Sequence, residues 1–70
     1  MQVINIEKTI QEAGISQYRL SKIIGSSPSM VWGWLSGRHK PSLEKYALME
    51  SKLNEHNIPI VWQHYSFDTD

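Results

Sequence analysis

The chain contains no cysteine, which excludes disulfide bonds and thiolate metal sites. It also has no apolar run that approaches the roughly 20 residues needed to cross a bilayer. Its first residues, MQVINIEKTIQEAG, lack the basic start and the apolar stretch of a signal peptide. These absences predict a cytoplasmic protein that has no membrane partner.

The residues that chemistry or metal binding would need are also scarce. The three histidines, His39, His56 and His64, are not spaced as metal ligands, and no carboxylate cluster accompanies them. No nucleophile–base pair, no paired carboxylates and no phosphate-binding glycine loop can be identified. The sequence therefore predicts a protein that is not an enzyme and has no metal, no cofactor and no small-molecule ligand.

The composition is that of a small globular domain. Of the 70 residues, 40% are hydrophobic and 20% are charged, which favours one folded domain over residues 1–70 rather than a disordered chain. The net charge is zero, but residues 16–45 carry five cations against one anion, a net charge of +4. A basic segment in a neutral chain indicates a surface that faces phosphate, and a plain solvated surface is the alternative.

Hydrophobic spacing and helix caps predict four helices, over residues 3–13, 17–24, 28–36 and 43–55. Gly14 follows the first of them, and Ser16, Ser27 and Ser42 stand at the capping positions of the other three. Inward positions expected on the last helix are Leu43, Tyr46, Ala47 and Leu53.

The C-terminal region fits two structures. Ile58, Val61, Trp62 and Tyr65 have the spacing of a short fifth helix over residues 59–65, which is the interpretation we favour. The same residues have high β-propensity, so an edge strand is the alternative. Residues 66–70 are expected to be frayed.

Residues 17–42, QYRLSKIIGSSPSMVWGWLSGRHKPS, combine two short helices, a tight turn and a basic loop. Ser21 is small enough for the helices to cross closely, and Gly25 can adopt the positive φ of a sharp turn. Val31 and Trp34, three residues apart, direct one face of the second helix to the core. This pattern is typical of the helix-turn-helix, which places a recognition helix in the major groove of DNA.

The run from Ser27 to Ser42, S-x-x-x-V-x-x-W-L-S-G-R-x-K-P-S, resembles the Cro/CI-type, or XRE-like, helix-turn-helix family. With Gln17 and Gly25 included, the resemblance covers about residues 4–56. It implies an all-α, compact four- or five-helix, lambda-repressor-like domain with the helix-turn-helix at helices 2 and 3. It also implies a sequence-specific transcriptional repressor, of the phage Cro type, that binds palindromic double-stranded operator DNA as a two-fold homodimer.

Two residues depart from the family pattern. Ser26 stands where the family more often has a small apolar residue. Gly33 lies inside the recognition helix, at a cost of about 1 kcal/mol relative to alanine. It is expected either to let a sugar-phosphate backbone approach or to make space beside the two flanking tryptophans.

The resemblance places the start of the recognition helix at base edges, where the candidate contacts are Ser27, Pro28, Ser29 and Trp32. Ser27 has the alternative role of a helix cap alone, and Trp32 that of packing against a neighbouring helix or a dimer partner. The helix has no Arg, Lys, Asn or Gln, the residues that read bases with paired hydrogen bonds. DNA shape and phosphate contacts are therefore expected to carry more of the specificity.

Candidate phosphate contacts flank this helix on both sides, and together they predict steeply salt-dependent binding. They are Gln17, Arg19, Lys22, Arg38, His39, Lys40 and Ser42. Three aromatic residues near the C-terminus, Trp62, Tyr65 and Phe67, are candidates for the dimer interface.

Two other functions remain open. One is an antitoxin-type autorepressor, which would use the same DNA-binding surface. The other is a protein-interaction module on a helix-turn-helix scaffold, which the zero net charge, the acidic tail and the apolar residues Pro28, Met30 and Trp32 favour.

Overall fold

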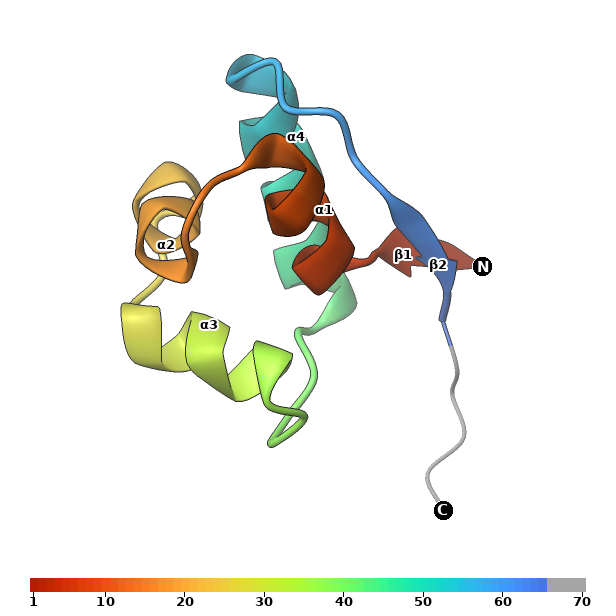
Figure 1. Cartoon of the computed structure of the whole chain (residues 1–70). Helices are drawn as coiled ribbons and strands as arrows, with labels where there is room; N and C mark the ends of the chain where they lie inside the picture. The colour runs from red at the N-terminus through yellow and green to blue at the C-terminus, as the bar shows by residue number, and fades with distance from the viewer. Residues whose placement is uncertain (66–70) are drawn as a thin grey trace.

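Four helices and two short strands make up residues 1–65, the part of the chain described by the computed structural model (Figure 1). In chain order the elements are β1 (Gln2–Ile4), α1 (Ile6–Ala13), α2 (Gln17–Ile24), α3 (Pro28–Leu35), α4 (Leu43–Glu55) and β2 (Trp62–His64). The mostly helical fold confirms the expected class, with α2 and α3 as the helix-turn-helix. The sequence interpretation did not include β1, and it gave a strand near the C-terminus only as the alternative.

The first helix is shorter than expected, because residues 3 and 4 belong to β1. Asn5 is extended (φ −84°, ψ 97°), and its side chain caps α1 by accepting a hydrogen bond from the Lys8 backbone N–H at 3.0 Å. Val3 and Ile4 are β-branched, which suits a strand, and both are buried. The helical spacing of Val3 with Ile6 and Ile10 was therefore correct as a sign of burial and wrong as a sign that Val3 is in a helix.

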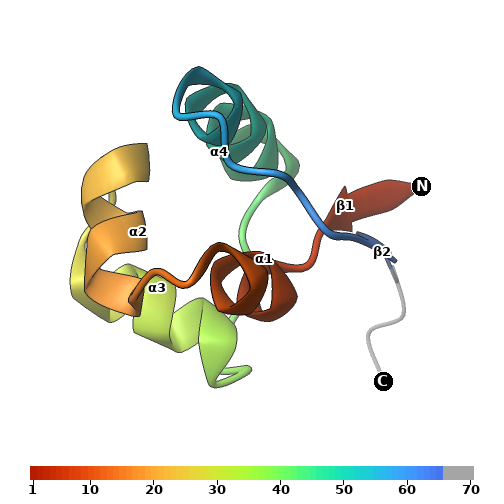
Figure 2. The ribbon, with the colours of Figure 1, turned by 45° about the horizontal axis from the view of Figure 1, so that its top comes forward.

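The fifth helix over residues 59–65 is also wrong, since residues 62–64 form β2 and the edge-strand alternative is correct. β2 pairs with β1 in antiparallel register, with Val3 opposite Gln63. Figure 2 shows the two strands side by side next to α1. The pairing gives the backbone of both chain segments its hydrogen bonds, which local helical spacing cannot anticipate. The expected fraying of residues 66–70, and Phe67 among them, lies outside the described residues.

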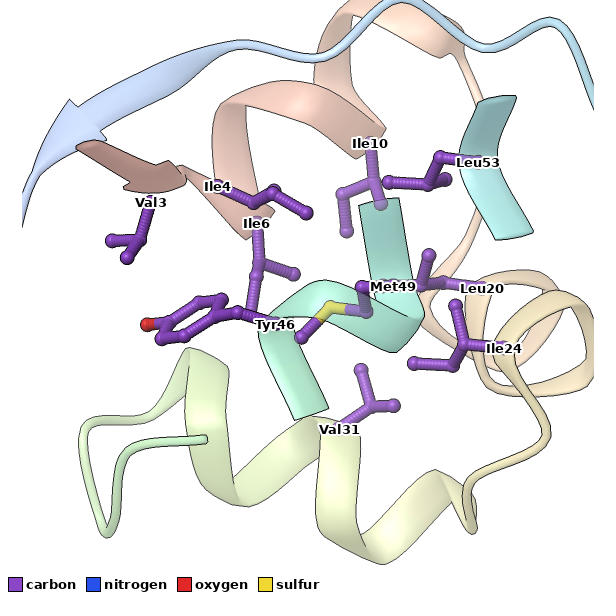
Figure 3. Close-up of a cluster of buried hydrophobic side chains, with 10 residues drawn as sticks. All are labelled: Val3, Ile4, Ile6, Ile10, Leu20, Ile24, Val31, Tyr46, Met49 and Leu53. Carbon is purple, nitrogen blue, oxygen red and sulfur yellow. The ribbon is translucent and has the colours of Figure 1, made fainter. Parts of the chain in front are cut away.

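The hydrophobic core lies where β1 and the four helices meet (Figure 3). On α4 the buried positions are Tyr46, Met49 and Leu53, at spacings of three and four residues. Leu43 and Ala47, expected to point inward, are exposed. The buried hydrophobic residues are Val3, Ile4, Ile6, Ile10, Leu20, Ile24, Val31, Tyr46, Met49 and Leu53.

Thr9 joins the C-terminal segment to α1 and is almost completely buried. Its hydroxyl accepts a hydrogen bond from the Val61 backbone N–H at 3.0 Å and donates one to the Val61 carbonyl at 3.4 Å. The Asn5 backbone N–H donates to the same carbonyl at 2.7 Å. These hydrogen bonds hold the segment just before β2 against α1.

Replacing Thr9 with valine is expected to destabilise the fold by about 1–3 kcal/mol, because the Val61 N–H loses its acceptor in a protected position. Thr9→Ser, which keeps the hydroxyl, is the matched control and should lose much less. Urea unfolding followed by circular dichroism measures both. Equal stability of Thr9→Val and the wild type would show that these bonds contribute nothing net.

Candidate DNA-binding surface

The turn between α2 and α3 is fixed by one residue that ends the first helix and two that begin the second. Gly25 adopts φ 76°, and its N–H donates to the Ser21 carbonyl at 2.9 Å. Ser27 then caps α3, its hydroxyl accepting a hydrogen bond from the Met30 N–H at 3.2 Å. Pro28 follows at the first helical position, where a backbone N–H is not needed. The two helices therefore enter and leave the turn at a defined angle.

Two serines lie near this turn, Ser21 on α2 and Ser26 in the turn itself. Ser21 is buried, and its hydroxyl donates to the Tyr18 carbonyl at 2.6 Å. The hydroxyl oxygen of Ser26 is also buried, and it has no hydrogen-bond partner among residues 1–65. A hydroxyl without a partner in a protected position costs free energy.

Ser26→Ala is therefore expected to stabilise the domain, by about 1 kcal/mol, because it removes a desolvated hydroxyl without removing a bond. Its neighbour supplies the control: Ser27→Ala removes the α3 cap and should destabilise by a similar amount. Thermal unfolding of the two variants should move in opposite directions. A lower melting temperature for Ser26→Ala would mean that its hydroxyl has a partner in solution.

The recognition helix α3 has a buried side and an exposed side. Val31 is completely buried, and Trp34 and Leu35 pack partly against the core. Pro28, Ser29, Met30 and Trp32 are exposed. The exposed fraction is 49% for Trp32 and 42% for Met30. Trp32 therefore does not pack into the core of its own domain.

A hollow of about 580 Å³ borders this exposed side, and we call it the recognition hollow. It is lined by Gln17, Pro28, Ser29, Trp32, Gly33, Arg38 and His39. It therefore brings together three of the four candidate base contacts and three of the seven candidate phosphate contacts. Ser27, the fourth base candidate, is exposed beside it and serves as the α3 cap.

The loop after α3 turns back over the end of the helix. Gly37 has φ 82°, which allows the reversal. The backbone N–H groups of Arg38 and His39 both donate to the Gly33 carbonyl, at 2.9 and 3.4 Å. The guanidinium carbon of Arg38 consequently lies 5.2 Å from the centre of a Trp32 ring, a cation–π contact.

Gly33 is explained by the same loop. A side chain at this position would collide with the imidazole of His39, which lies against the glycine. The glycine thus makes space, as one of the two expectations proposed for the flanking tryptophans. The space is occupied by His39, however, and not by the flanking tryptophans.

The other candidate phosphate contacts lie outside the hollow. Arg19 and Lys22 are exposed on α2, and the Lys22 ammonium lies 5.2 Å above the Tyr18 ring. The Lys40 ammonium lies 5.6 Å from the Tyr65 ring. The Ser42 hydroxyl caps α4 by accepting a hydrogen bond from the Lys45 N–H at 3.1 Å. Ser42 therefore has a structural role whether or not it contacts DNA.

Of the two aromatic interface candidates within residues 1–65, Trp62 is exposed and Tyr65 is partly buried, while Phe67 lies outside the described residues. Tyr65 packs against the core edge-on to Tyr46, with ring centres 6.1 Å apart and planes at 83°. Burial raises the pKa of the Tyr46 phenol, and the neighbouring Tyr65 raises it further. The Tyr46–Tyr65 pair therefore belongs to the packing of the domain itself.

Sequence reasoning missed the contacts of Arg38 with Trp32 and of His39 with Gly33. Neither follows a helical or strand period, because each joins a helix to the loop that follows it. The one available signal was Gly37, whose freedom at positive φ lets the loop reverse.

Other kinds of site are not found in residues 1–65. No three histidine, cysteine, aspartate or glutamate side chains there are grouped so that they could hold a metal ion. Within the same residues, no helix has the length and apolar character required to span a membrane.

Comparison with known proteins places these features in a family. The chain matches the family described as Helix-turn-helix over residues 6–56, which include the whole of α1 to α4. Neither the curated proteins nor the solved structures that were searched contain a match. The family match agrees with the resemblance of residues 27–42 and with the geometry of α2 and α3. The chain therefore belongs to the Cro/CI-type helix-turn-helix family and is a DNA-binding regulator of the XRE type.

Proposed function

We propose that this protein is a sequence-specific transcriptional repressor that binds operator DNA through α3 and blocks access of the transcription machinery. The observation that carries the proposal is the recognition hollow. Exposed residues of α3 form one of its sides, and Gln17 and Arg38 flank it. A helix inserted in the major groove needs such flanking donors, because contacts to phosphate fix its register on the duplex. Repression acts on DNA in the cytoplasm.

The start of α2, as well as the positive charge of Arg38, supports contact with phosphate. Gln17 begins α2, whose first N–H groups point out of the helix, and an anion is favoured there. Arg38 lies on the other side of the same hollow. A phosphate backbone that follows both sides of α3 would meet a donor at each.

A two-fold dimer is the second part of the proposal. Trp62, with 44% of its surface exposed, shares an apolar hollow with Met1 and Leu43, which are also exposed. We call these three residues the sheet-side patch. Within residues 1–65 each strand has a partner on one edge only, so the sheet could be extended by a second copy.

The position of the sheet is compatible with such a dimer. Figure 1 shows the sheet on the side of α1 that faces away from α2, which leaves the helix-turn-helix free. The domain measures 34 × 24 × 20 Å. A dimer that holds its two α3 helices about 34 Å apart, one turn of DNA, would let both helices read half-sites of the operator. A palindromic operator follows from this symmetry.

Selection from a random duplex library at near-physiological salt tests both parts. A recovered site with two-fold symmetric half-sites one helical turn apart supports a dimeric repressor. Recovery of a single asymmetric half-site would be compatible with a repressor and would contradict the dimer.

Trp62→Ser should lower the dimer fraction in sedimentation without abolishing half-site binding. Tyr18 is an exposed aromatic residue on α2, and Tyr18→Ser should leave the dimer fraction unchanged.

The protein-interaction module is a second candidate because Met30 and Trp32 expose large apolar surfaces on α3. Salt separates the two functions. Binding through phosphates falls steeply as salt rises, whereas an apolar protein interface is much less sensitive. A folded protein that enriches no duplex sequence would favour the interaction module.

A further inference from the structure

The α3 side of the recognition hollow has few hydrogen-bonding groups for a surface that reads bases. Along α3 its lining consists of Pro28, Ser29, Trp32 and Gly33. Ser29 offers one hydroxyl, which can bond to purine or pyrimidine edges and discriminates poorly between them. The remaining α3 lining offers apolar surface and no side-chain hydrogen bond into the hollow, apart from the indole N–H of Trp32.

We infer that the recognition hollow receives thymine methyl groups, and that Trp32 is the residue that distinguishes thymine in the operator. The inference rests on the proposed function, in which α3 enters the major groove. The thymine methyl is the one apolar group that base pairs present there, and contact with an apolar side chain is how proteins recognise it. Pro28 and the Trp32 indole provide that surface on the same side of α3.

Arg38 makes Trp32 suitable for this role. An exposed tryptophan has several side-chain conformations, and ordering it on binding would cost conformational entropy. The guanidinium of Arg38, 5.2 Å from the centre of a Trp32 ring, favours one of these conformations before DNA arrives. Arg38 is itself held by the bond from its backbone N–H to the Gly33 carbonyl at 2.9 Å. The apolar surface of Trp32 is thus oriented by the loop that also supplies the phosphate contact.

Gly33 and His39 both line the hollow beside Trp32. Gly33 has no side chain, and the His39 imidazole lies over it. A larger residue at 33 would have to displace the His39 imidazole.

Deoxyuridine provides a direct test, because it pairs with adenine as thymine does and lacks only the methyl group. The probe is the duplex recovered by selection, with each thymidine replaced in turn by deoxyuridine. We expect one or two positions in each half-site at which the change weakens binding about fourfold, the effect of removing one buried methyl. Trp32→Ala should abolish this sensitivity while retaining binding to the phosphate backbone.

The control variant is Met30→Ala, since Met30 is similarly exposed on α3 but does not line the hollow. Met30→Ala should keep the deoxyuridine sensitivity of the wild type. Circular dichroism checks that both variants fold, which is expected because neither residue is in the core.

The outcomes separate the inference from the proposed function. A selected site that binds equally well with deoxyuridine at every position would overturn the thymine inference and leave the repressor intact. Sensitivity that persists in Trp32→Ala would assign the methyl contact to another residue and overturn the role of Trp32. If no sequence is enriched at all, the proposed function fails, and the inference fails with it.

Discussion

Replacing Arg38 with alanine is expected to lower affinity for every duplex, specific or not, by roughly tenfold to a hundredfold per half-site. A hydrogen bond from a charged group contributes about 1.5–3 kcal/mol, which converts to a loss of that size. The substitution also removes the partner that orients Trp32 at 5.2 Å. The slope of log affinity against log salt should become shallower by about 0.9 for each phosphate that the protein no longer neutralises.

Two further variants separate charge from stacking. Arg38→Lys keeps the positive charge but loses the planar group that lies over the Trp32 ring, so we expect an intermediate loss. Lys52→Ala removes one charge from the last turn of α4 and should change affinity little. Fluorescence anisotropy with a labelled duplex at several salt concentrations measures all three. Unchanged affinity of Arg38→Ala would show that the proposed phosphate contact is absent.

The parts of the fold that could be predicted are those set by neighbouring residues. Ser16, Ser27 and Ser42 each accept a hydrogen bond from a backbone N–H three residues later, as their place before the helices indicated. Gly25 and Gly37 adopt positive φ at the ends of α2 and α3. Such signals act within one turn of helix, so a single sequence carries them completely.

The parts that failed depend on distant partners. Val3 has a helical spacing with Ile6 and Ile10, but β1 exists because β2, more than fifty residues later in the chain, pairs with it. The same reason applies to Trp62, whose helical spacing with Tyr65 competes with that pairing. At the candidate site, the positions of Arg38 and His39 depend on how one loop folds back over Gly33. Residue type predicted which side chains could meet DNA, but not how Arg38 would orient Trp32.

Replacing Met49 with alanine is expected to have the largest effect on stability, a loss of about 2–5 kcal/mol. Met49 has no exposed surface, and its side chain lies among residues from the other helices (Figure 3). The substitution would leave a cavity at the centre of the core. A domain of this size has a total stability of roughly 4–10 kcal/mol, so the variant would be close to unfolding at ambient temperature. The adjacent Leu48 is 38% exposed, and Leu48→Ala is the matched control, with little expected loss.

The same variant tests whether DNA binding and folding are linked. Because α2 packs on both α3 and α4, loss of the core should release the helix-turn-helix, and affinity should fall with the folded fraction. DNA that binds only the folded form should in turn stabilise it. At a free DNA concentration one hundred times the dissociation constant, the free energy of unfolding should rise by about 2.7 kcal/mol. Circular dichroism of Met49→Ala, titrated with the selected duplex, should therefore show helix content rising with DNA. Helix content that stays low while DNA is bound would mean that recognition does not require the folded α2 and α3.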